Sequence, residues 1–102
     1  MHTGVYEARK RKKHSLNIID EQLRARFVVY ESGRGDKKRV YHVGNATLEF
    51  SDMNSYFKVK ITSQSPQEIY GFEEDLIVME GLEKLVRIAM IERTLETIPE
   101  RT

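Results

Sequence analysis

Residues 55–62 alternate between apolar and polar side chains more regularly than any other part of the chain. Phe57, Val59 and Ile61 occupy every second position, and polar or charged residues fill the positions between them. Successive side chains of a β-strand point to opposite faces of the sheet. The segment therefore predicts a strand with one face against a core and the other in water, which is typical of an antiparallel sheet that is covered on one side only.

Other segments join this strand in the predicted sheet. Three of them are rich in β-branched and aromatic residues and are bounded by turn residues: 24–31, 38–43 and 46–50. The four strands follow one another along the chain, which predicts an antiparallel meander. Residues 68–72 either add a short fifth strand or lead into a helix. Residues 15–23 fit extended chain or a short helix, and we favour extended chain.

The apolar residues of the C-terminal region follow a helical spacing. Over residues 82–98 they form two stripes, and Pro99 ends the pattern. Residues 76–79 are either the first turns of this helix or a final strand ended by Gly81. The fold class predicted is thus α+β, with an antiparallel meander of four to five strands packed on one long C-terminal helix.

Composition limits the class of protein. The chain has 102 residues, of which 39% are hydrophobic and 32% charged, and it has no Cys. It is long enough for one core, and no uncharged run is long enough to cross a membrane. Without Cys there is no disulfide, thiolate zinc site or cysteine nucleophile. We expect an intracellular protein of the cytoplasm or nucleoid, or of the nucleus in a eukaryote, with no metal and no cofactor.

Charge is distributed unevenly along the chain. Residues 1–43 contain 11 Lys and Arg against 5 Asp and Glu, a net charge of +6, whereas residues 44–102 contain 6 against 11, a net charge of −5. Five consecutive cations stand near the start: Arg9, Lys10, Arg11, Lys12 and Lys13. Because like charges repel, we expect residues 1–14 to form a flexible basic arm that contacts phosphates, and residues 15–102 to form a single α+β domain.

The same alternation rule predicts what the solvent-facing side of the sheet displays. We place Val40 and His42 inward, and Arg39, Tyr41 and Val43 outward, although a slip of one residue would reverse this choice. The outward set then interleaves cations with aromatic rings: Arg26, Tyr30, Arg39, Tyr41, Tyr56, Lys58 and Lys60. Bases of single-stranded nucleic acid stack on aromatic rings while Lys and Arg neutralise the backbone.

These patterns predict a small nonenzymatic accessory or regulatory protein that binds nucleic acid, single strands rather than duplex. We find no pattern of catalytic residues. The alternative is a protein-interaction module, an adaptor, inhibitor or assembly subunit. It would use the wide apolar face of the C-terminal helix, with Ile88, Ile91, Leu95 and Ile98, to contact a second copy of the chain or another protein.

Overall fold

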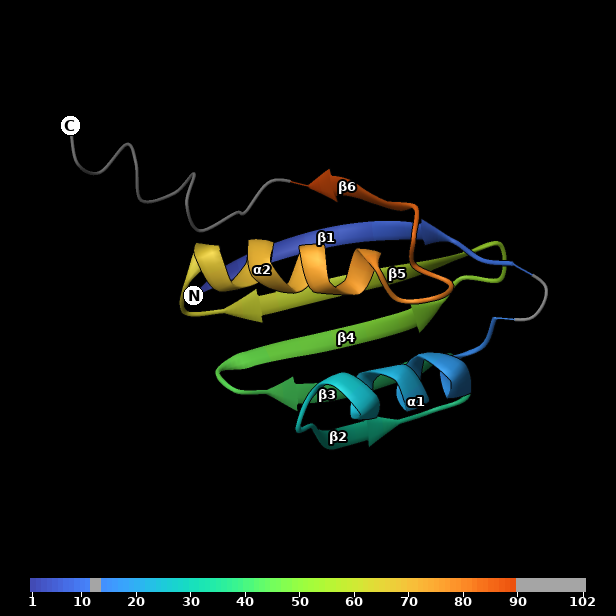
Figure 1. Ribbon diagram of the computed structural model, residues 1–102, viewed down its shortest axis with the longest axis horizontal. Helices are drawn as coiled ribbons and strands as arrows, with labels where there is room; N and C mark the ends of the chain where they lie inside the picture. The colour runs from blue at the N-terminus through green and yellow to red at the C-terminus, as the bar shows by residue number, and fades with distance from the viewer. Residues whose placement is uncertain (12–13, 90–102) are drawn as a thin grey trace.

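The computed structural model describes residues 1–11 and 14–89 of the chain. In chain order its elements are β1 (His2–Arg9), α1 (Leu16–Arg26), β2 (Tyr30–Arg34), β3 (Lys38–Val43), β4 (Ala46–Asp52), β5 (Tyr56–Ser63), α2 (Pro66–Ile77) and β6 (Leu85–Ala89). The strands form one sheet in the order β2-β3-β4-β5-β1-β6, with every neighbouring pair antiparallel. Both helices lie on the same face of this sheet (Figure 1). The predicted α+β class and antiparallel sheet are confirmed.

The strands β3, β4 and β5 form the meander that the sequence predicts. Gly44, with a φ of 60°, provides the left-handed backbone needed in the tight turn between β3 and β4. Phe57, Val59 and Ile61 of β5 are fully buried, and so are Leu48 and Phe50 of β4. The alternation of β5 was therefore assigned to the correct faces.

The N-terminal segment is part of the sheet and not a free arm. β1 lies between β5 and β6, and its register with β5 runs from His2 opposite Ser63 to Arg9 opposite Tyr56. Gly4, Tyr6 and Ala8 alternate into the core. The prediction of a flexible arm over residues 1–14 is wrong for this strand, because burial of these alternate positions outweighs the proximity of the basic run.

The segment after the basic run is helical. Ser15 caps α1, its Oγ accepting a hydrogen bond of 3.3 Å from the backbone N–H of Ile18. Leu16, Ile19 and Leu23 lie on one stripe of the helix and are buried. The preference for extended chain over residues 15–23 was wrong, and so was the strand at 24–31: the chain enters β2 only at Tyr30.

The second helix lies earlier in the chain than predicted. Ser65 caps α2, Pro66 occupies its first turn, and Ile69, Phe72 and Leu76 face the core. The long C-terminal helix over residues 82–98 is not found in the described residues, since Leu85–Ala89 forms β6 along β1. Residues 90–98 lie outside the described part of the chain. The apolar positions at 82, 85, 86 and 89 fit a helix locally, but residues 85–89 instead pair their backbone with β1 along one edge.

The core lies between the sheet and the two helices. α2 lies over β1 and β5, and α1 covers β2 and β3 (Figure 1). Gly4 allows α2 to approach β1 closely, since a Cβ atom there would stand 2.9 Å from Cγ2 of Ile69 and 2.7 Å from the hydroxyl of Tyr6. With one face packed in this way, no described element covers the opposite face of the sheet.

Candidate nucleic-acid interface

The face of the sheet that is turned away from the helices is called the open face below. Its layout follows from the strand register, because residues paired across neighbouring antiparallel strands point to the same side. A first row across β2, β3, β4, β5 and β1 is uncharged and rich in hydroxyl groups: Tyr30, His42, Thr47, Thr62 and Thr3. A second row holds Val40, Glu49, Lys60 and Val5. A third holds Lys38, Ser51, Lys58 and Glu7, and a fourth holds Tyr56 and Arg9.

The open face has more cations than carboxylates in these rows. Lys38 forms an ion pair of 2.6 Å with Glu49, whereas Arg9, Lys58 and Lys60 are exposed and form no ion pair with any described residue. Glu7 lies opposite Lys58 across the β1–β5 ladder, with no ion pair between the two described side chains. Three cations on this face are thus available to a partner.

The helix-bearing side has the opposite sign of charge along α2. The helix contains four carboxylates, Glu68, Glu73, Glu74 and Asp75, and no Lys or Arg. A polyanion is therefore repelled from α2, whereas the cations of the open face attract it.

Two β3 residues of the predicted binding set, Arg39 and Tyr41, do not lie on the open face. Tyr41 is fully buried, with its ring edge-on to Phe50 at 5.9 Å, and Arg39 is only 8% exposed. The register of β3 is reversed from the prediction: Arg39, Tyr41 and Val43 point toward the helices, while Val40 and His42 point to the open face. The expected pair of stacking rings, Tyr41 and Tyr56, is therefore not present on one surface.

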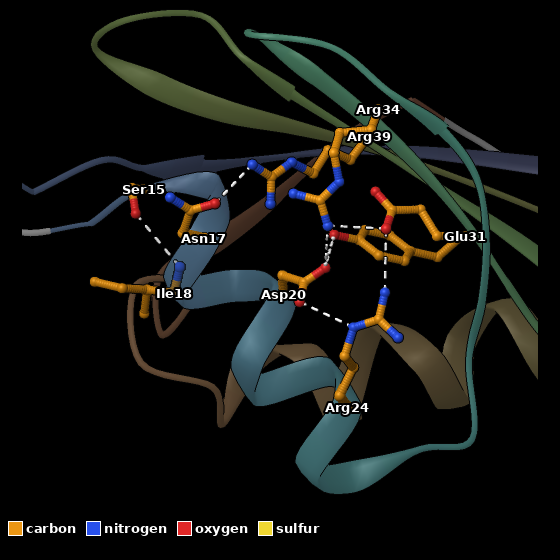
Figure 2. Close-up of polar contacts among 9 residues, drawn as sticks. Ser15, Asn17, Ile18, Asp20, Arg24, Glu31, Arg34 and Arg39 are labelled. Atoms are coloured by element: carbon orange, nitrogen blue, oxygen red, sulfur yellow. Dashed lines mark hydrogen bonds and ion pairs between the residues drawn. The ribbon is translucent and has the colours of Figure 1, made fainter.

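Tyr41 and Arg39 belong to a polar cluster beneath α1. Figure 2 shows Arg39 in this cluster together with Asn17 and Asp20 of α1. The Tyr41 hydroxyl donates a hydrogen bond of 2.7 Å to Asp20, and Nη2 of Arg39 donates one of 2.7 Å to Asn17. Burial together with the bond to Asp20 raises the pKa of Tyr41 to about 12. The Nε and Nη1 atoms of Arg39 have no hydrogen-bond partner among the described residues. Both side chains serve the packing of α1 on the sheet.

The carboxylates of this cluster are held by two arginines. Arg24 donates to Asp20 at 2.9 Å and to Glu31 at 3.1 Å, and Arg34 contacts the same two carboxylates at 3.3 and 2.9 Å (Figure 2). Partial burial would raise the pKa of Asp20, but the hydrogen bonds from Tyr41 and Arg24 and the charges of both arginines bring it below the ordinary value. The charges within the cluster are thus largely satisfied internally.

The described part of the basic run, Arg9 to Arg11, is mostly engaged with the protein itself. Lys10 forms an ion pair of 2.7 Å with Asp52 and stands 5.5 Å from the ring centre of Phe57, and Arg11 pairs with Glu83. Arg9 is the last residue of β1 and stays free on the open face. Lys12 and Lys13 lie outside the described residues. Arg9 of this run therefore lies on the open face, whereas Lys10 and Arg11 hold other parts of the fold through ion pairs.

The remaining predicted residues lie elsewhere. Arg26 is exposed in the last turn of α1, on the helix-bearing side. Ile88 belongs to β6 and not to a helix, while Ile91, Leu95 and Ile98 lie outside the described part of the chain. The proposed apolar helix face therefore has no counterpart in the structure where it is described.

The structure adds residues that the sequence analysis did not select. His42 lies on the open face, its ring 5.8 Å from that of Tyr30, with Ser32 and Thr47 within hydrogen-bond distance of its two nitrogens. Glu7 and Lys84 join Arg9 and Tyr56 around a hollow where β1, β5 and β6 meet. One pattern in the sequence could have predicted β1: the buried residues Gly4, Tyr6 and Ala8 alternate with the half-buried Val5 and Glu7.

Other classes of site find little support in the described residues. Within residues 1–11 and 14–89, no three His, Asp or Glu side chains are grouped closely enough to hold a metal ion. None of the helices in that part of the chain has the length and apolar character needed to cross a bilayer. Comparison with protein-family models, curated proteins and solved structures finds no match to this chain. Function must therefore be inferred from the open face itself.

Proposed function

We propose that this protein binds single-stranded nucleic acid across the open face of its sheet and has no catalytic role in doing so. The observation that carries the proposal is the position of Arg9, Lys58 and Lys60, three exposed cations without ion pairs among the described residues, around Tyr56 on an uncovered face. Cations that neutralise phosphates, beside a ring on which a base can stack, are the elements of single-strand recognition.

The arrangement of the aromatic residues defines the path of the strand. Tyr56 is in the fourth row on β5, and Tyr30 is in the first row on β2 at the far edge. Three strand spacings of about 4.8 Å and three row spacings of about 6.8 Å separate the two rings by roughly 25 Å. They cannot hold adjacent bases, so the strand runs diagonally, with Lys58 and Lys60 contacting phosphates between them. A site of several nucleotides matches the size common for single-strand binders.

An uncovered sheet face favours single strands over duplex. Bases of a duplex are stacked on one another and cannot reach a flat aromatic platform, whereas the bases of a single strand are free to do so. The described residues place no helix on the open face that could enter a major groove. Whether the strand is DNA or RNA depends on contacts to the 2′-hydroxyl group, for which Thr47 and Thr62 in the first row are available donors and acceptors.

Salt-dependent binding tests this proposal. The affinity for a fluorescein-labelled dT15 strand is measured by anisotropy from low to moderate salt, where counterion release predicts a linear fall of log K with log salt. The double variant Lys58→Gln/Lys60→Gln should reduce the slope by about 1.4, from about 0.7 per phosphate contact on a single strand. Arg26→Gln is the matched control, since it removes a free cation from the helix-bearing side and should leave the slope unchanged. Absence of wild-type binding to dT15 and to the matching rU15 at low salt would overturn the proposal.

A further inference from the structure

A hollow of about 420 Å³ opens at the end of the sheet where β1 finishes and β5 and β6 begin, the end marked by the β1 arrowhead in Figure 1. Glu7, Arg9, Tyr56, Lys84 and Val86 contribute to its lining. It lies next to the open face, at the corner that holds the fourth row. Its size falls in the range of sites that take a small organic group, and one nucleotide is such a group.

The chemistry of the lining combines three kinds of contact. Tyr56 is half-buried and presents an aromatic side chain, and Val86, which is 60% exposed, adds an apolar surface. Arg9 and Lys84 are exposed cations without ion pairs in the described part of the chain. They can neutralise a phosphate, and the aromatic and apolar side chains can pack against a base.

Glu7 is the carboxylate that lines the hollow. Its carboxylate is half-buried and forms no hydrogen bond or ion pair within residues 1–11 and 14–89, although Lys58 stands opposite it in the register. A carboxylate that served only to balance the cations of the open face would be paired with one of them, as Glu49 is with Lys38 at 2.6 Å. An ionised carboxylate accepts hydrogen bonds and donates none, so it seeks a group that presents donors.

We propose that the hollow seats one guanine nucleotide of the bound strand, with the two oxygens of Glu7 accepting hydrogen bonds from the base. Guanine presents two neighbouring donors, N1–H and the N2 amino group, on its Watson–Crick edge. Adenine and cytosine place a ring acceptor beside their amino group, and thymine and uracil flank their single N–H with two carbonyl oxygens. Only guanine matches a bare carboxylate with two donors. This inference rests on the proposed single-strand binding and names the base that the site prefers.

The preference is measured with labelled strands that differ at one base. A dT12 strand with one central dG should bind about 5- to 150-fold more tightly than dT12 or the strands with one central dA or dC, the range expected for one bidentate base contact. Replacing that dG by deoxyinosine removes the N2 amino group and should abolish most of the gain. This comparison needs no protein variant, so it holds even where a substitution impairs folding.

Two variants test whether Glu7 causes the preference for dG. Glu7→Gln should equalise the affinities for the dG strand and for dT12 while binding to dT12 persists. Glu49→Gln makes the same change of charge on the open face, outside the hollow, and should keep the preference for dG. Binding of dT12 without any preference for dG, or a preference that survives Glu7→Gln, would overturn the guanine site and leave single-strand binding intact. Failure of the wild-type protein to bind any of these strands at low salt would overturn both.

Discussion

The Tyr41 hydroxyl donates a hydrogen bond of 2.7 Å to Oδ2 of Asp20 and thereby joins β3 to α1 across 21 residues of sequence. This bond explains why a tyrosine that looks suited to a wet sheet face is buried. The ring packs against Phe50, while the hydroxyl reaches a carboxylate that Arg24 and Arg34 also hold. A buried tyrosine hydroxyl usually requires such a partner.

The same contacts make the free energy of unfolding depend on pH in the acid range. The pKa of Asp20 in the folded protein lies below the ordinary value of 3.8, so the folded state favours the charged carboxylate. Its contribution to the free energy of unfolding is complete above that value and is lost as pH falls through the folded pKa. Urea unfolding from pH 7 down to pH 2 should therefore show a flatter acid decline for Asp20→Asn than for the wild type. Asp36→Asn is the control, because Asp36 is exposed and has no hydrogen bond or ion pair within the described residues; an equal flattening there would contradict the assignment.

Close packing between β1 and α2 depends on Gly4. An added Cβ would stand 2.7 Å from the Tyr6 hydroxyl and 2.9 Å from Ile69, so Gly4→Ala should lower the free energy of unfolding by about 1–3 kcal/mol. Gly71 is the matched control, since it lies within α2 with nothing within 4 Å of its added Cβ. Gly71→Ala should raise stability by about 0.5–1 kcal/mol. Chemical denaturation followed by circular dichroism measures both, and a neutral Gly4→Ala would show that α2 does not approach β1 so closely.

The sequence predicted the buried face of a strand correctly where only one set of alternate residues is apolar. It predicted the wrong face where two sets compete. In β5 only one set of alternate residues is apolar, and its faces were assigned correctly. In β3 the set with Arg39, Tyr41 and Val43 competes with the set containing Val40 and His42. The buried choice depends on Asn17 and Asp20 of α1, which accept hydrogen bonds from Arg39 and Tyr41. These partners lie far away in sequence, so local patterning could not reveal them.

The C-terminal error has the same origin. Spacing alone favoured a helix from residue 82 onward, and a helix satisfies its own backbone without help from other segments. The chain instead forms β6, because β1 enters the sheet and presents a free edge to Leu85–Ala89. Once residues 1–14 were interpreted as an arm, that edge was missing from the predicted fold. Part of the candidate site was lost with it, since Glu7 and Lys84 gather only where β1, β5 and β6 meet.

Lys10 and Arg9 are neighbours in the basic run but have different roles. The Lys10 ammonium contacts Asp52 at 2.7 Å, and the side chains are 20% and 9% exposed, so Lys10→Met leaves a mostly buried carboxylate without its main partner. Burial would raise the pKa of Asp52, but the hydrogen bond from Lys10 is among the contacts that lower it. We expect a loss of about 1.5–3 kcal/mol in the free energy of unfolding. Arg9→Gln should change stability by less than about 0.5 kcal/mol yet weaken strand binding. A loss of less than about 0.5 kcal/mol in Lys10→Met would show that Lys10 is not an anchor.

Tyr56 is the aromatic residue on which the proposed interface most depends. Tyr56→Ala should weaken binding to labelled dT15 by about 1–3 kcal/mol, the stacking contribution of one base, while Tyr56→Phe should keep most of the affinity because the ring remains. Tyr70→Ala is the control on the helix-bearing side, where Tyr70 is 38% exposed and accepts a hydrogen bond from Arg87, and it should bind dT15 like the wild type. Anisotropy titrations at one fixed salt concentration measure all three variants. If Tyr56→Ala and Tyr70→Ala bind equally well, the strand does not stack at this corner, and the cations of the open face act on phosphates alone.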